Sequence, residues 1–130
     1  MQFGLSEEQI LLQDNVNRFL DDNSPLDRVR NYADGGEDSD IWAGLAELGI
    51  PALLIPEAQG GIRLQPMDAA IVAECLGSHI APTPFLGSAV MAPTALVASG
   101  GDHGELLAEI AAGTTRVGIA FGEAIKRRND

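Results

Sequence analysis

The chain has 130 residues, the size of one domain, and such a domain buries roughly two-thirds of the surface that its unfolded chain exposes. Hydrophobic residues make up 45% of the sequence, a share typical of globular proteins and above that of disordered chains. The net charge of −11 argues against nucleic acid and anionic membrane surfaces as partners, because both attract clustered Lys and Arg.

The cysteine content and the N-terminus give no sign of export. The single cysteine, Cys75, cannot form a disulfide within the chain, so nothing in the sequence indicates an oxidising compartment. No N-terminal stretch combines basic residues with the apolar run of a signal peptide, and no apolar run approaches the roughly 20 residues that cross a bilayer. We therefore expect a soluble cytoplasmic protein.

The first predicted helix begins with a capping box, in which Ser6 and Gln9 each satisfy a backbone N–H of the other. A stripe of apolar residues follows at helical spacing: Leu12, Val16, Phe19 and Leu20. Residues 21–25 end this helix. A short helical turn over residues 26–32 then leads into an acidic loop over residues 34–40, for which a solvated surface is the simplest interpretation.

The centre of the chain combines a short helix with an apolar run between two prolines. The helix carries Trp42, Leu45 and Leu48, and Gly49 is a natural stop for it. Pro51 and Pro56 bracket the apolar run, so we expect residues 50–55 to cross the interior as extended chain covered by helices. The glycine pair at residues 60–61 predicts a sharp turn after this crossing.

A buried central helix is predicted next. Pro66 suits its first turn, Asp68 lies near its N-terminus, and Ala69–Leu76 is nearly all apolar. Cys75 on this helix is better interpreted as a small core residue than as a nucleophile, because no His or Lys occupies a neighbouring helical position.

The C-terminal half is predicted to contain a proline-rich link, two helices and one strand. Residues 81–84 form a stiff proline-rich link, and residues 86–99 form a small-residue helix in which Pro93 predicts a kink or a break. A last helix over residues 106–111 ends before Gly113. The alternation of Val117, Ile119 and Phe121 with small residues then predicts a single strand.

A search for catalytic groups is mostly negative. His79 and His103 have no paired carboxylates or cysteines at ligand spacing, so the sequence predicts no metal site. It contains neither a nucleophile elbow, nor a phosphate-binding loop, nor a dinucleotide-binding glycine motif. We predict no catalytic residue within the chain.

The order of the segments resembles the N-terminal helical domain of acyl-CoA dehydrogenases. The similarity rests on Leu-Ala-Glu-Leu-Gly-Ile-Pro-Ala-Leu-Leu-Ile-Pro-Glu at residues 45–57, on the glycine pair at 60–61, and on Ala-Glu-Cys-Leu-Gly at 73–77. The opening at residues 5–9 and the helix at 106–113 are also similar to that family. The resemblance covers about residues 3–123.

The resemblance implies an oxidoreductase of fatty acid and lipid metabolism with three domains. FAD lies between a middle β-barrel and a C-terminal helical bundle, and a homo- or hetero-oligomer is usual. A glutamate outside the N-terminal domain removes the α-proton of the acyl-CoA thioester, and hydride passes from the β-carbon to the flavin. We therefore expect the 130 residues alone to be inactive and to carry no coloured flavin. They would be either a piece of a longer chain that ends before the barrel, or one chain of an enzyme whose other domains lie on a separate chain.

The same resemblance implies the site residues. The N-terminal domain closes one wall of the acyl pocket, and its nearest matching segment carries the candidate substrate-binding residues Thr83, Pro84, Ser88 and Ala92. Small side chains in this helix leave room for an acyl tail, although they equally permit close helix contacts. In the family, the first β-strand leads into a sequence motif that lies near the flavin and the thioester. Only the glutamate of that motif is present here, as Glu123, which the resemblance makes a cofactor-binding candidate.

We predict an all-α fold of about five helices in an up-down arrangement, with the extended crossing and one C-terminal strand stub. Residues 1–113 would form the helical domain and residues 114–130 the start of the middle β-domain. Two alternatives stay open. One is a non-catalytic helical interaction module or partner subunit whose strand, residues 117–121, pairs with a partner's sheet. The other is the corresponding domain of a related flavin monooxygenase.

Overall fold

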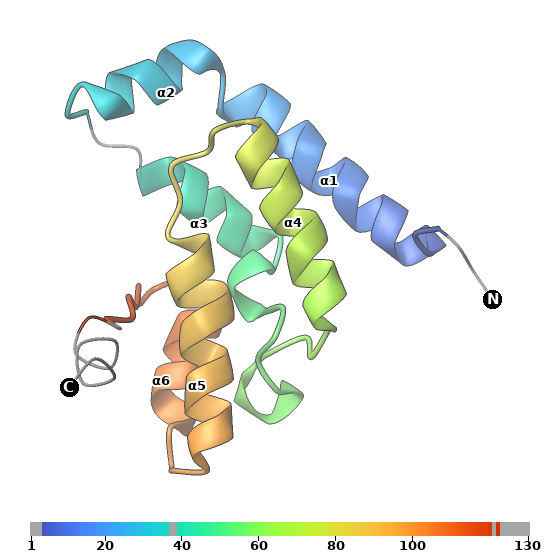
Figure 1. The fold of residues 1–130 in the computed structure, drawn as a ribbon, viewed down its shortest axis with the longest axis vertical. Helices are drawn as coiled ribbons and strands as arrows, with labels where there is room; N and C mark the ends of the chain where they lie inside the picture. Colours follow the sequence, from blue (N-terminus) through green and yellow to red (C-terminus); the bar gives the residue numbers. More distant parts are fainter. Residues whose placement is uncertain (1–3, 37–38, 121, 123–130) are drawn as a thin grey trace.

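Six α-helices dominate the part of the chain that the computed structural model describes, residues 4–36, 39–120 and 122, and no β-strand forms in this part (Figure 1). The helices are α1 (Glu7–Asn23), α2 (Leu26–Ala33), α3 (Ser39–Glu47), α4 (Pro66–Ser78), α5 (Ala92–Ser99) and α6 (Gly104–Ala111). Shorter helical turns join them: the 3₁₀ turns η1 (Ile50–Ala52) and η2 (Glu57–Gln59), and the π-helix η3 (Leu86–Met91). The predicted all-helical class is confirmed.

Helices α1 and α4 lie side by side and run in the same direction (Figure 1). The predicted capping box of α1 is confirmed, because the Ser6 hydroxyl accepts from the Gln9 N–H at 3.2 Å and the Gln9 side chain accepts from the Ser6 N–H at 3.0 Å. At the other end of the pair, His79 and Asp21 approach to 2.9 Å. Between these polar ends, Val16 and Leu20 are buried against α4 and α3.

The segment after α3 joins two hydrophobic cores. Ile50 and Leu53 belong to the core formed with α1, α3 and α4, whereas Ala52 and Ile55 belong to a second core with α5 and α6. All four side chains are at most 5% exposed. The predicted burial of this apolar run is therefore correct, and it holds the two halves of the fold together.

The predicted extended conformation of residues 50–55 is wrong, because residues 50–52 form a 3₁₀ turn. Gly49 ends α3 in the left-handed region at φ 78°, and Pro51 then occupies the first turn of η1, where a missing N–H costs no hydrogen bond. Residues 61–64 fold back over this turn, and the Leu64 N–H donates to the Leu53 carbonyl at 2.7 Å.

The C-terminal region keeps some of the predicted pattern. The predicted kink or break at Pro93 is not confirmed, because the backbone stays helical where the π-helix η3 gives way to α5 at Ala92. Residues 115–120 alternate between half-buried and exposed positions, as a strand would, yet they pair with no other strand in the described chain. The predicted strand stub is thus not confirmed, and Phe121 lies outside the described residues.

Candidate functional site

An apolar groove of about 660 Å³ lies between α2, the C-terminal half of α4 and the link that precedes η3. Its twelve lining residues include no charged side chain: Val29, Tyr32, Ala33, Ala73, Leu76, Gly77, Ile80, Ala81, Pro82, Thr83, Phe85 and Leu86. On a chain of net charge −11, a charge-free surface of this size is suited to an apolar ligand.

Helix α2 forms one side of the groove without being anchored in a core. None of its residues is buried, and it projects from one end of the bundle (Figure 1). Tyr32 leaves 45% of its surface exposed and Leu26, on the same helix, leaves 57%. An amphipathic helix normally buries its apolar face, so α2 presents apolar side chains that the described residues do not cover.

The link on the opposite side of the groove begins with a strained residue. Ile80 has φ 50°, a left-handed conformation that a β-branched residue rarely adopts. It follows the C-cap of α4, where the Ile80 N–H donates to the Gly77 carbonyl at 3.1 Å and the Ala81 N–H donates to the Leu76 carbonyl at 2.9 Å. This pair of bonds is a Schellman motif, which usually places glycine at this position. Ile80 instead holds an apolar side chain, 63% exposed, at the groove.

The structure separates the four predicted substrate-binding residues into two groups. Thr83 lines the groove, and Pro84 is half-buried immediately beside it. Ser88 and Ala92 are 0% and 2% exposed, so their side chains lie in the packed interior behind the link. The cofactor-binding candidate, Glu123, lies outside the described residues.

Sequence reasoning missed the partner of Ser88. The Ser88 hydroxyl accepts from the Val117 N–H at 2.8 Å and donates to the Val117 carbonyl at 3.0 Å. The two residues are 29 positions apart, and no local pattern connects them. The one available signal was a polar residue inside an otherwise apolar small-residue helix, because a buried hydroxyl requires a partner.

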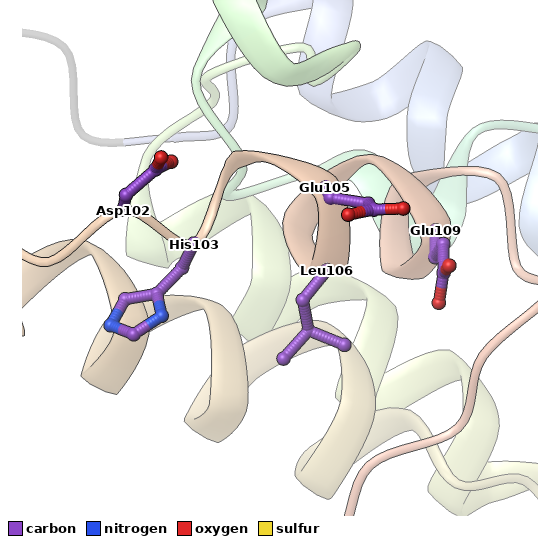
Figure 2. A pocket seen from close by; sticks show the side chains of 5 residues that line it. All are labelled: Asp102, His103, Glu105, Leu106 and Glu109. Atoms are coloured by element: carbon purple, nitrogen blue, oxygen red, sulfur yellow. The ribbon is translucent and has the colours of Figure 1, made fainter.

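A second hollow, of about 380 Å³, lies at the start of α6 and is acidic. Figure 2 shows the Asp102 carboxylate pointing away from the His103 ring, with Glu105 above Leu106 in this view and Glu109 farther along α6. The His103 ring instead pairs with the Ser99 hydroxyl at 2.9 Å. Across the described chain, no three His, Cys, Asp or Glu side chains gather to hold a metal ion.

Two other titratable groups have structural roles. Burial in the first core, followed by the nearby Glu74 charge, raises the pKa of the Cys75 thiol, which disfavours the nucleophilic thiolate. The hydrogen bond to Asp21 raises the pKa of His79, and the Cys75 carbonyl adds to the effect.

Within the described residues, no helix is long and apolar enough to cross a membrane.

Comparison with known proteins gives the family. Residues 6–114 match the family described as acyl-CoA dehydrogenase, N-terminal domain. The chain is 38% identical over 120 residues to acyl-CoA dehydrogenase IpdE2 of Mycolicibacterium smegmatis, across 90% of this chain and 38% of that protein. It is 39% identical over 88 residues to acyl-CoA dehydrogenase IpdE2 of Mycobacterium tuberculosis, across 67% of this chain and 27% of that protein.

The fold has a similar solved counterpart. A chain in the crystal structure of the ChsE4–ChsE5 complex from Mycobacterium tuberculosis superposes with a TM-score of 0.78 and 26% sequence identity, over 93% of this chain and 34% of that chain. The present chain therefore spans about a third of the length of the proteins that it matches. Taken together, the helical fold and the match over residues 6–114 show that the chain belongs to the acyl-CoA dehydrogenase family, as its N-terminal domain.

Proposed function

We propose that this chain supplies the N-terminal helical domain of a flavin-dependent enzyme that dehydrogenates acyl-CoA thioesters in lipid metabolism. The family match over residues 6–114 supports the reaction class. In this proposal, residues 1–113 form the helical domain and residues 114–130 lead into the β-domain. The chain takes part in binding the acyl group, and the groups that react with it lie outside these residues.

The charge-free groove carries the proposal for substrate binding. Along the link, Leu86 is exposed and Thr83 is half-buried, and the buried Phe85 ring lines the groove from beneath. An acyl chain offers no hydrogen bonds, so a wall of methyl, methylene and ring groups suits it. Thr83 and Pro84 would contact the acyl chain, and Ser88 and Ala92 would support the wall from behind.

Neither the groove nor the acidic hollow at α6 fits a flavin by itself. FAD carries a pyrophosphate, which proteins bind with cationic side chains or glycine-rich helix N-termini. The groove has no Lys or Arg in its lining, and the hollow at α6 is lined by carboxylates. The proposal therefore assigns FAD binding to residues beyond the described part, with Glu123 as the candidate nearest to it in sequence.

We also propose a hetero-oligomeric and cytoplasmic enzyme. The similar solved structure is a complex of two named proteins, ChsE4 and ChsE5, which supports a partner subunit for this chain. The single cysteine is free and buried, as a reducing compartment allows. Light scattering of the enzyme assembled with its flavin-binding domains would give the subunit number, and a monomer would contradict the oligomer.

The reaction class is tested by mixing the assembled flavoenzyme with acyl-CoA in the absence of oxygen. We expect the absorbance of the oxidised flavin to bleach and the 2,3-unsaturated thioester to form in equal amount. A flavin that stays oxidised with every acyl-CoA, but is reduced by NADH and then consumes oxygen, would favour the monooxygenase alternative instead.

A further inference from the structure

The Ser88 side chain takes the place that a neighbouring strand would occupy beside Val117. Ser88 is 0% exposed, and its hydroxyl satisfies both main-chain groups of Val117, with distances of 2.8 Å and 3.0 Å. In an extended chain, the N–H and C=O of one residue point to the same side. One hydroxyl therefore does the work of the two ladder hydrogen bonds that a strand partner would make.

The approach of the two segments depends on the residue before Ser88. A Cβ at Gly87 would lie 2.8 Å from the Val117 carbonyl oxygen, which is closer than a real Cβ contact allows. Gly87 thus lets η3 and the extended segment come within hydrogen-bonding distance. Leu86 precedes it on the same π-helix and lines the groove, so the contact also fixes the groove wall relative to this segment.

The contact determines which side chains face the helices. Val117 and Ile119 pack against the second core, whereas Arg116, Gly118 and Ala120 are exposed. A slip by one residue would exchange the two sets, because side chains alternate along an extended chain. The main-chain groups of Arg116 and Gly118 point away from Ser88, and they make no hydrogen bond within the described part of the chain.

We propose that Ser88 is a positioning residue that sets the register of residues 115–120 as the chain leaves the helical domain. The hydroxyl selects Val117 as the residue held against η3, and it leaves the edge formed by Arg116 and Gly118 open for pairing with a sheet. The register follows from the contact between Ser88 and Val117 alone, whereas the sheet that would pair with this edge rests on the proposed domain arrangement.

Amide hydrogen exchange of the full chain by NMR tests the proposal. The readout is the exchange rate of the Val117 amide divided by that of the Ile110 amide in α6, so that a change in global stability cancels. We expect the Ser88→Ala variant to raise this ratio about tenfold, as the loss of one net hydrogen bond implies. The matched control is Thr94→Ala, which removes an exposed α5 hydroxyl that donates to the Val90 carbonyl at the end of η3, and it should leave the ratio unchanged.

Register is read separately by thiol labelling in a Cys75→Ala background. The thiol of a Gly118→Cys variant should react severalfold faster than that of a Val117→Cys variant, and adding Ser88→Ala should bring the two rates together. Gly87→Ala gives a second variant that keeps the hydroxyl but pushes Val117 away, and it should have the same two effects. Exchange at Val117 as fast as at Arg116 in the wild type, or unchanged ratios in both variants, would overturn the proposal.

Discussion

The Gln9 side-chain amide donates to the Asp68 carboxylate at 3.0 Å, and this bond joins the N-terminal caps of two parallel helices. Gln9 already completes the capping box of α1 with Ser6. Asp68 also accepts from the Gln65 N–H at 2.8 Å and so caps α4. Two local motifs that fix where each helix begins are thereby linked to fix how the helices lie against each other.

This linkage makes Asp68 the expected weak point of the α1–α4 pair. Asp68→Ala removes the cap of α4 and leaves the Gln9 amide without its acceptor, at a cost of about 1–3 kcal/mol in unfolding free energy. Urea unfolding of the wild type and the variant measures this loss of unfolding free energy. Asp14→Ala, at an exposed position in the middle of α1, should change the unfolding free energy by less than about 0.5 kcal/mol. Equal effects from both variants would show that the linked caps add nothing.

The other end of the same pair should respond to pH. His79 Nδ1 lies 2.8 Å from the Cys75 carbonyl and Nε2 lies 2.9 Å from the Asp21 carboxylate. Both partners are acceptors, so the arrangement favours the doubly protonated ring. The hydrogen bond to Asp21 is the main reason that the pKa of His79 is raised above 6.5 in the folded chain.

A raised pKa of the folded state gives a stabilising contribution that is complete below the unfolded pKa, near 6.5. This contribution is lost as pH rises through the higher pKa of folded His79. The stability difference between wild type and Asp21→Asn should therefore shrink above pH 6.5. It should be less than about 1 kcal/mol at its largest, because Asp21 is 73% exposed. Asp22→Asn is the control, and a pH-independent difference for Asp21→Asn would contradict the assignment.

Two glycines should respond to alanine in opposite directions. A Cβ at Gly61 would overlap the Ile55 carbonyl, where the chain folds back over η1. Gly61→Ala should therefore lower the unfolding free energy by at least about 2 kcal/mol. Gly77 lies inside α4 with open space where its Cβ would be. Gly77→Ala should raise the unfolding free energy by up to about 1 kcal/mol, because alanine favours helix. Thermal unfolding of both variants measures these changes. An unchanged unfolding free energy for Gly61→Ala would mean that the turn shifts to accommodate the added Cβ.

Ile80 should trade stability for the shape of the groove. Replacing it with glycine relieves the left-handed strain and removes little buried surface, so Ile80→Gly should raise the unfolding free energy by about 1 kcal/mol. The same change removes an apolar side chain from the groove, and it should weaken acyl-CoA binding in the assembled enzyme. Thermal unfolding measures the effect on stability, and a titration with acyl-CoA measures the effect on binding. A destabilised Ile80→Gly variant would contradict the claim that Ile80 is strained.

Local chemistry accounts for what the sequence could predict. Ser6 with Gln9, Pro66 with Asp68, and Gly113 define helix ends through contacts within a few residues, and the structure has helix ends at or near these positions. The conformation after Gly49 could not be predicted in the same way. Pro51 suits both an extended chain and the first turn of a 3₁₀ helix, and packing of residues 50–55 into two cores selects the turn.

The candidate site depends on contacts that no local pattern reveals. The groove is assembled from α2, α4 and the link before η3, so its charge-free lining appears only when the three are brought together. Ser88 illustrates the same point, because its hydroxyl is used by a residue 29 positions away. The resemblance led to Thr83 and Ser88 alike, and only the fold separates the groove residue from the buried one.

The most direct test of the acyl wall is the chain-length profile of the assembled flavoenzyme. Thr83→Phe should fill part of the groove and lower kcat/KM for long acyl-CoA substrates at least about tenfold more than for short ones, since each methylene excluded costs about 0.8 kcal/mol. Thr94→Phe introduces the same ring at an exposed position on α5 outside the groove and should leave the profile unchanged. An identical chain-length profile for wild type and Thr83→Phe would contradict the assignment of this groove to the acyl chain.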